Sequence, residues 1–122
     1  DEDSNVRAEA ANALASYGVE RAWPLLSRAF AADDAWLVRC SILSALAEQP
    51  EIDLNWLLEL SSMAITDPDG TVRVSGAEIL GRLVRDGAGQ PVGDQARLML
   101  QPLQQDSDHR VVAAALNGLQ VN

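Results

Sequence analysis

The chain contains one fourteen-residue pattern four times, and this repetition restricts its fold more than any other feature. Each copy opens with Asp, carries Val at its sixth position and ends with Leu at its fourteenth. The copies are DEDSNVRAEAANAL (1–14), DDAWLVRCSILSAL (33–46), DPDGTVRVSGAEIL (67–80) and DSDHRVVAAALNGL (106–119). Their valines, Val6, Val38, Val72 and Val111, lie 32, 34 and 39 residues apart. That spacing is typical of repeats built from two helices.

Each copy has the features of a helix start. Acidic and turn-forming residues open it, and their side-chain oxygens supply N-caps that stabilise a helix by about 1 kcal/mol each. Apolar residues then recur at helical spacing, as Val38 and Ile42 do in the second copy. Three copies have a small residue at the tenth position, which lets a neighbouring helix approach closely; these residues are Ala10, Gly76 and Ala115.

A second amphipathic segment follows each of the first three copies, at about residues 19–31, 52–65 and 93–104. Pro102 should kink or end the last of these helices, because proline lacks a backbone donor and clashes with the preceding turn. Seven helices result. The sequence therefore predicts an all-α fold, an α-α superhelix (solenoid) of about three and a half two-helix repeats, as one domain over residues 1–122.

The pattern Asp-x-x-x-x-Val-Arg followed by an Ala- and Leu-rich helix resembles HEAT-like repeats, in particular the bacterial kind also found in phycobilisome lyases. The segment VERAWPLLSRAF (19–30) looks like the second, outer helix of that repeat. The resemblance covers essentially the whole chain. It implies an armadillo-like helical fold. It is much less specific about function.

Arginine follows the leading aspartate by six residues in three copies: Asp1 and Arg7, Asp33 and Arg39, Asp67 and Arg73. Each repeat of a solenoid contacts its neighbours, so an arginine of one repeat can reach the aspartate that opens an adjacent one. A planar guanidinium suits a bidentate contact with a carboxylate. We predict a ladder of such pairs that ends where Val112 replaces the arginine. The alternative is a set of surface ion pairs that stabilise little.

The formal net charge is −9, and all nine basic residues are arginines. An acidic surface repels phosphate backbones and anionic lipids, so we expect neither a nucleic acid nor a membrane as a partner. Cys40 is the single cysteine, which excludes an internal disulfide and is consistent with a reducing compartment. We predict a cytoplasmic location.

One segment imitates a calcium-binding loop. Oxygen-bearing side chains stand at the first, third, fifth, ninth and twelfth places of DPDGTVRVSGAE (67–78). The sixth place must be Gly for the sharp turn of such a loop, and here it is Val72. Since the repeat explains the same residues as a helix cap and helix start, we expect no calcium site.

The other candidates for chemistry are isolated. His109 is the only histidine, so a His-based metal cluster or a Cys–His–Asn arrangement cannot be assembled within the chain. The paired His–Glu motifs of some HEAT-repeat enzymes are absent for the same reason. Cys40 is expected to be a small, partly buried residue. The sequence predicts no catalytic residue and no cofactor.

The inner helices, which start each repeat, should line the concave surface, the usual binding site of a solenoid. With the repeated Val taken as buried, the positions two, three and six residues later should point outward. These are Ala8, Glu9 and Asn12; Cys40, Ser41 and Ser44; Val74, Ser75 and Glu78; Ala113, Ala114 and Asn117. Trp36, just before an inner helix, is the preferred exposed anchor, because Trp is enriched at interface hot spots.

Three functions follow from these features. The first is a non-catalytic interaction or scaffold module that binds another protein through Trp36, Glu9, Asn12, Ser41, Ser44, Ser75 and Glu78. The second, implied by the resemblance alone, is a phycobilisome-lyase-like protein that handles a bilin or a phycobiliprotein. The third is a structural segment of a longer solenoid, expected because the chain starts at Asp1 without Met and both ends carry the same helix type.

The ladder predicts that Arg39→Lys lowers the urea midpoint of unfolding more than Arg28→Lys does, because Arg39 alone of the two stands at a ladder position. Both exchanges keep the charge, so a difference reports the loss of the planar fork. Equal midpoints would contradict the ladder.

Overall fold

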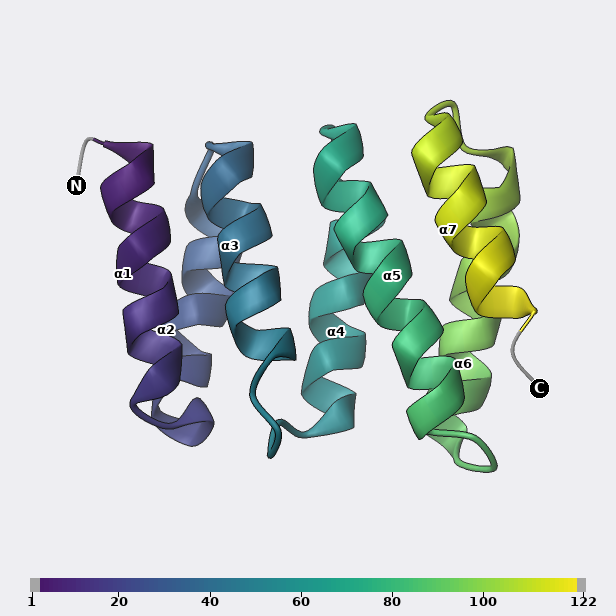
Figure 1. The fold of residues 1–122 in the computed structure, drawn as a ribbon, viewed down its shortest axis with the longest axis horizontal. Coiled ribbons are helices and arrows are strands. Elements are labelled where there is room, and N and C mark those ends of the chain that lie inside the picture. The colour runs from purple at the N-terminus through teal and green to yellow at the C-terminus, as the bar shows by residue number, and fades with distance from the viewer. Residues whose placement is uncertain (1–2, 121–122) are drawn as a thin grey trace. The chain divides into compact units, whose positions relative to one another are not determined.

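A computed structural model describes residues 3–120, which form seven α-helices, one short 3-10 helix and no strand (Figure 1). The elements are α1 (Ser4–Ser16), α2 (Val19–Ala32), α3 (Trp36–Ala47), α4 (Leu54–Ala64), α5 (Gly70–Asp86), α6 (Pro91–Leu100), η1 (Gln101–Gln105) and α7 (His109–Leu119). The predicted all-α fold is confirmed, as is the number of helices. We keep the name inner helices for α1, α3, α5 and α7, and outer helices for α2, α4 and α6.

Aspartate caps most of the inner helices, although the leading aspartate of the pattern is not the N-cap. In three repeats the cap is the third residue of the pattern, whose carboxylate accepts a hydrogen bond from the backbone N–H two residues later: Asp3, Asp69 and Asp108. In the remaining repeat the cap is Ala35, which has no side-chain oxygen. The acidic starts therefore supply cap oxygens in three repeats out of four.

Helix ends follow the breakers in the sequence. Gly18, which separates α1 from α2, has a φ of 129°, a conformation that L side chains rarely adopt. Pro102 lies in η1, where the chain leaves the α-helical conformation after Leu100. The prediction that Pro102 ends or kinks its helix is confirmed, because a residue without a backbone N–H cannot continue the hydrogen-bond ladder.

The chain divides into two compact units, residues 1–52 and residues 53–122. The first unit contains α1, α2 and α3, and the second contains α4, α5, α6, η1 and α7. We describe each by itself. The single domain expected over residues 1–122 stays a prediction.

In the first unit, α1 packs mainly against α3, and α2 packs against both. The face that α1 buries carries Ala8, Ala11 and Ala15. Val6 was expected to be buried, but 48% of it is exposed. The prediction is wrong for this repeat, because α3 covers the alanine face of α1 while no described helix covers the face that carries Val6.

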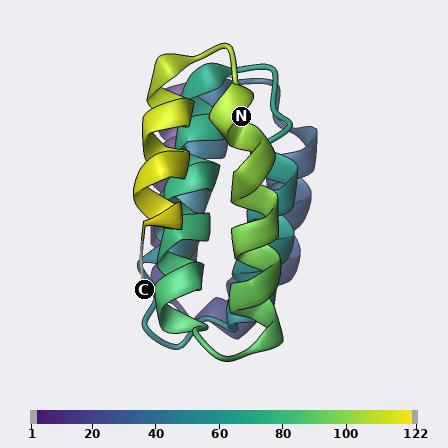
Figure 2. The same cartoon turned by 90° about the vertical axis from the view of Figure 1, so that its right-hand side faces the viewer.

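In the second unit, α5 packs against α4, α6 and α7. Figure 2 views this unit from the side of α6 and α7, which lie in two different layers. The contact between α5 and α7 is close because glycines face each other: a Cβ on Gly118 would lie 3.0 Å from the Cα of Gly81 and 2.7 Å from a methyl carbon of Leu100. Small residues thus set the distance between these inner helices.

Two residues of the predicted outward stripe are buried. Ala8 is 7% exposed and Ala114 is 8% exposed. Ala8 lies one helical turn from Ala11, on the face that α1 buries. Ala114 lies four residues before Gly118, on the face that α7 buries against α5. Both corrections have one cause: the buried stripe of an inner helix includes the side that touches the neighbouring inner helix.

The Gly81–Gly118 contact predicts that Gly118→Leu destabilises the chain by about 1–3 kcal/mol, because the larger side chain must displace the α5 backbone or Leu100. Asn117→Leu is the matched control, since Asn117 is exposed on the same helix. Urea unfolding followed by circular dichroism measures both. A loss no larger for Gly118→Leu than for Asn117→Leu would show that the helices separate without cost.

Candidate partner-binding site

A bidentate ion pair joins the first two inner helices in the first unit. Arg7 donates from Nε to Asp33 Oδ2 at 2.7 Å and from Nη2 to Asp33 Oδ1 at 3.1 Å. Asp33 also accepts from the backbone N–H of Ala35 at 2.9 Å. The leading aspartate therefore holds both its own turn and the arginine of the preceding repeat.

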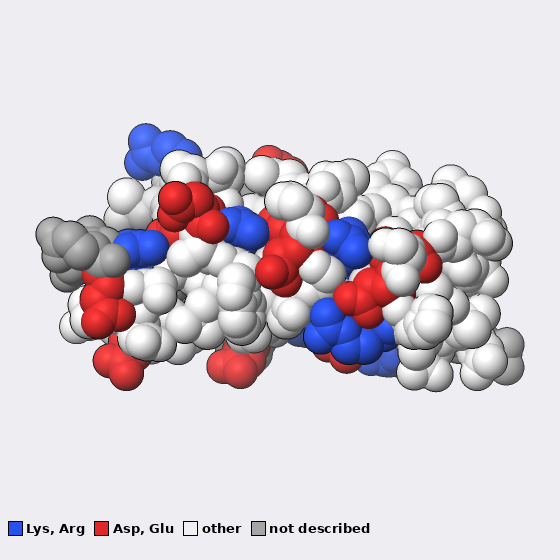
Figure 3. Space-filling model, turned by 90° about the horizontal axis from the view of Figure 1, so that it is seen from above, with Lys and Arg blue, Asp and Glu red and all other residues white. Residues whose placement is uncertain are grey.

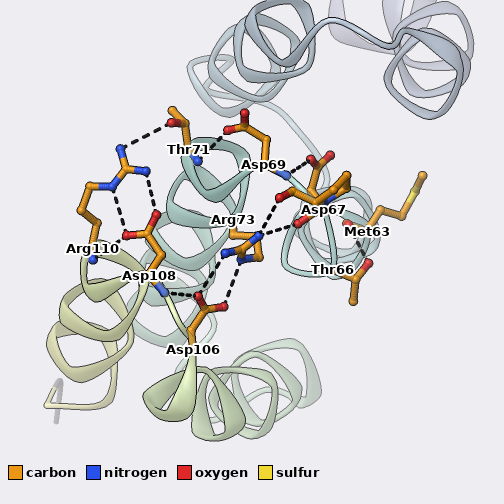
Figure 4. A network of polar contacts seen from close by, with 10 residues as sticks. Met63, Thr66, Asp67, Asp69, Thr71, Arg73, Asp106, Asp108 and Arg110 are labelled. Carbon is orange, nitrogen blue, oxygen red and sulfur yellow. Dashed lines mark hydrogen bonds and ion pairs between the residues drawn. The ribbon is translucent and has the colours of Figure 1, made fainter.

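The second unit contains the same contact between its last two repeats (Figure 4). Arg73 donates from Nε to Asp106 Oδ2 at 3.0 Å and from Nη2 to Asp106 Oδ1 at 3.2 Å. Its remaining nitrogen, Nη1, donates to the backbone carbonyls of Asp67 and Pro68 at 2.8 and 3.1 Å. One guanidinium thus ties the turn before its own helix to the turn before the next inner helix.

A further arginine extends this network at the start of α7. Arg110 pairs with Asp108 at 2.7 Å, and its Nη1 donates to the hydroxyl of Thr71 at 3.4 Å. Thr71 lies in the first turn of α5, so the contact links the starts of two inner helices (Figure 4). The repeat pattern did not predict Arg110, because it stands at the fifth position, where the other copies have no arginine.

These contacts lower the pKa values of the aspartates. The side-chain hydrogen bond from Arg7, together with the Ala35 N–H, lowers the pKa of Asp33 against the opposing effect of burial. Burial raises the pKa of Asp106, but hydrogen bonds from the Asp108 N–H and from Arg73 outweigh it, and the net direction is down. Arg110 lowers the pKa of Asp108 to about 2. Each carboxylate is held in its charged form.

The structure does not test one pair of the predicted ladder, the pair of Arg39 with Asp67. Asp1 lies outside the described residues. Arg39 donates from Nη1 to the backbone carbonyl of Asp33 at 2.9 Å, the bond that Arg73 makes to Asp67 in its own repeat. Arg39 and Asp67 belong to different units, so a pair between them stays a prediction.

A groove of about 430 Å³ lies between α1 and α3 in the first unit. Asn12 of α1 and Ser41 and Ser44 of α3 line it, together with Cys40. These four residues belong to the stripe that the sequence predicted to point outward. The structure therefore brings together the candidates from two repeats on the walls of one groove.

Sequence reasoning missed half of the groove lining. Ser16, Ala45, Glu48 and Gln49 also line it. Ser16 follows Asn12 by four residues and Glu48 follows Ser44 by four, so helical periodicity was the signal that could have found them. The stripe was traced over one turn of each helix, whereas the groove extends to the C-terminal ends of α1 and α3.

The other candidates lie apart from this groove. Glu9 is exposed on α1, and Glu78 is exposed on α5 while Ser75 is half-buried there. Trp36 is the first residue of α3, and 47% of it is exposed. None of these residues lines the α1–α3 groove.

Charged side chains gather elsewhere. In each unit, Arg and Asp or Glu side chains lie together on the face where the inner helices begin, as Figure 3 shows from above. The groove opens between the later turns of α1 and α3, and Glu48 is the one charged residue in its lining. Neutral polar groups therefore dominate the groove, while the Arg7–Asp33 pair lies at the opposite end of α1.

The remaining candidates from the sequence are Cys40 and His109. Cys40 is a half-buried thiol of α3, and His109 is exposed at the start of α7. Among residues 3–120, no three His, Cys, Asp or Glu side chains are grouped so that they could hold a metal ion. The helices within that range are all too short or too polar to cross a membrane.

Residues 1–47, which span α1 to α3, match the family model of HEAT repeats. The match supports a HEAT-like repeat protein. No curated protein and no solved structure matches the chain. The HEAT-like match thus covers the part of the chain that forms the α1–α3 groove and the Arg7–Asp33 pair.

The network of Figure 4 predicts that Arg73→Lys destabilises the chain by about 1 kcal/mol at neutral pH, because lysine cannot form the bidentate contact with Asp106. Arg82→Lys is the matched control: it lies on the same helix and pairs with Asp86 at an exposed site, where an ion pair contributes a few tenths of a kcal/mol. Urea unfolding of both variants measures the difference.

The same pair sets a pH dependence. Since the folded-state pKa of Asp106 is lowered, its contribution is present above the unfolded pKa of about 3.9 and is lost as pH falls through the lower folded value. The gap between wild type and Arg73→Lys should therefore stay constant from pH 7 to about pH 5 and shrink below pH 4. A gap that does not shrink as Asp106 is protonated would show that the guanidinium acts through its bonds to the carbonyls of Asp67 and Pro68 or through packing, and not through Asp106.

Proposed function

We propose that the chain is a non-catalytic module that binds another protein on the surface of its inner helices. HEAT repeats generally mediate protein–protein interaction, and the family is typically non-catalytic. Within the first unit, the α1–α3 groove is the proposed contact. Its overlap with Asn12, Ser41 and Ser44 is the observation that carries the proposal.

The chemistry of the groove favours a protein segment as the ligand. Its walls offer amide and hydroxyl groups, which donate and accept hydrogen bonds, and they carry little charge. A volume of about 430 Å³ is large enough for several waters, which side chains of a partner can displace. Such a groove accepts a loop or helix edge through direct hydrogen bonds.

We propose two further contacts, each within its own unit. Trp36 offers a large, half-exposed aromatic side chain at the start of α3. In the second unit, Glu78 is exposed on α5 with Ser75 half-buried three residues before it. Aromatic anchors contribute most of the energy of many interfaces, whereas rim carboxylates mainly affect the association rate. We therefore assign Trp36 the larger effect on affinity.

Partner capture with groove variants tests the proposal. Immobilised chain is incubated with lysate of the source organism, and bound proteins are identified by mass spectrometry. Asn12→Arg places a long side chain in the groove and should reduce recovery of the main partner by at least about tenfold, as loss of a central contact does. Asn55→Arg, on an exposed position of α4 that does not line the groove, makes the same charge change and should leave recovery unchanged.

The outcomes separate the competing functions. Equal recovery by wild type, Asn12→Arg and Asn55→Arg contradicts a contact in the groove, and recovery of nothing above background contradicts a binding module. A pigment-carrying partner, or a visible absorbance change when the chain is mixed with a bilin, would favour the lyase-like alternative instead.

A further inference from the structure

One end of the α1–α3 groove is lined by three polar residues that stand where α1 and α3 end: Ser16, Glu48 and Gln49. Ser16 is the last residue of α1, and Glu48 is the C-cap of α3. The two helices run in the same direction (Figure 1), so both bring their C-terminal ends to this part of the groove. We call it the acceptor end, because its side chains mainly accept hydrogen bonds.

The hydrogen bonds within the first unit already use donors of the acceptor end. The Ser16 hydroxyl donates to the carbonyl of Ala13 at 2.7 Å, so its lone pairs can only accept from a ligand. Gln49 donates from Nε2 to the carbonyl of Ala45 at 3.3 Å, which occupies one N–H and leaves Oε1 as an acceptor. The carboxylate of Glu48 accepts only. A ligand group at this place must therefore mainly donate.

The acceptor end is also negatively charged. Glu48 is exposed, and among residues 3–120 no ion pair joins it to an arginine. Neither α1 nor α3 has a basic residue in its last turn, whereas α5 has Arg85 and α6 has Arg97. Helix C-terminal ends carry a partial negative charge and favour cations. Two such ends and one carboxylate thus act on the same part of the groove.

A second depression continues the groove past the acceptor end. It has a volume of about 230 Å³ and shares Gln49 with the groove. Its other lining residues are Gly18, Val19, Pro50 and Glu51. Glu51 is exposed and has no ion pair within the part of the chain that the structure describes. An extended segment that leaves the groove here passes a second carboxylate.

The packing of the inner helices shows that a preceding repeat leaves this surface open. Asn12 and Ser16 hold the twelfth and sixteenth positions of the repeat. On α3 these positions carry Ser44 and Glu48, which are exposed although α1 packs against α3. Asn117, at the twelfth position of α7, is exposed although α5 packs against that helix. A helix pair packed on α1 in the same way would not cover the groove.

We propose that the acceptor end binds a basic side chain, arginine or lysine, from a segment of the partner protein. This inference rests on the proposed function, because it specifies the ligand of the same groove. Guanidinium and ammonium groups donate hydrogen bonds and accept none, which matches the acceptors of Ser16, Glu48 and Gln49. Their charge complements the carboxylate, the two helix ends and the net charge of −9. A second basic residue of the segment lies beside Glu51.

The same features disfavour other segments. A carboxylate or phosphate of a partner would face Glu48 and two helix C-terminal ends, and like charges in such a contact repel. A neutral amide side chain offers fewer donors and no charge. The acceptor end therefore selects a basic segment by electrostatics, in addition to the hydrogen bonds that the remainder of the groove provides.

Titration with a defined peptide tests this selection. The chain, labelled with nitrogen-15, is titrated at low ionic strength with acetyl-GRGRG-amide while its backbone amide signals are followed by NMR. The signals of Ser16, Glu48 and Gln49 should shift with a Kd of about 1 mM, the range of a few hydrogen bonds. The matched peptides acetyl-GQGQG-amide and acetyl-GEGEG-amide should shift none of these signals at the same concentrations.

Two variants with the same change in net charge locate the contact. Glu48→Gln keeps the shape of the side chain and should raise the Kd of the arginine peptide about threefold to tenfold, as loss of a charge-assisted hydrogen bond does. Glu9→Gln, at an exposed position of α1 that does not line the groove, should leave the Kd unchanged. Both carboxylates are exposed, so circular dichroism should show both variants folded.

The outcomes decide the proposal. Equal binding of the arginine and glutamine peptides, or equal weakening by Glu48→Gln and Glu9→Gln, overturns it. A dimer that Glu48→Gln dissociates in sedimentation would replace the partner by an arginine of a second copy. Partner capture with Asn12→Arg scores the proposed function separately. Capture that depends on Asn12 without a preference for arginine rejects only the basic ligand, whereas selective peptide binding without a captured partner rejects only the binding module.

Discussion

The bidentate contact between an arginine of one repeat and the leading aspartate of the next is the interaction on which the arrangement of these helices depends. It fixes the start of α3 to α1 through Arg7 and Asp33, and the start of α7 to α5 through Arg73 and Asp106. The Arg73 guanidinium also binds the turn before its own helix, where it donates to the backbone carbonyl of Asp67. Two parallel hydrogen bonds to one carboxylate restrict both distance and orientation, which a single point charge cannot do.

With the helix starts fixed, side-chain size determines how closely the inner helices approach. Gly81 and Gly118 bring α5 and α7 together along their later turns. Alanines do the same on the α1 face that packs against α3. Between the later turns of α1 and α3 lies the polar groove that Asn12 and Ser44 line. The proposed partner contact is therefore a consequence of the same helix pairing that holds the repeats.

The two grooves of the first unit differ in chemistry because they lie beside different faces of α1. Toward α3, the helix presents Asn12 and Ser16. Along the register of the repeated valine it presents Val6 and Leu14, whose equivalents in later repeats lie beneath an outer helix. A hydrogen-bonding ligand suits the first face, whereas the second face is apolar.

The sequence by itself determined the all-α fold, the seven helices, the break at Pro102 and the pairing of arginine and aspartate types, because these follow from local periodicity and from a pattern that recurs. Tertiary packing alone decided which face of each helix is buried. Ala8 and Ala114 are covered although the repeat placed them outward, and Val6 is exposed although it placed Val6 inward. The groove residues Ala45 and Gln49 also came only from the structure. A helical pattern specifies which residues share a face, whereas the neighbouring helix determines whether that face is covered.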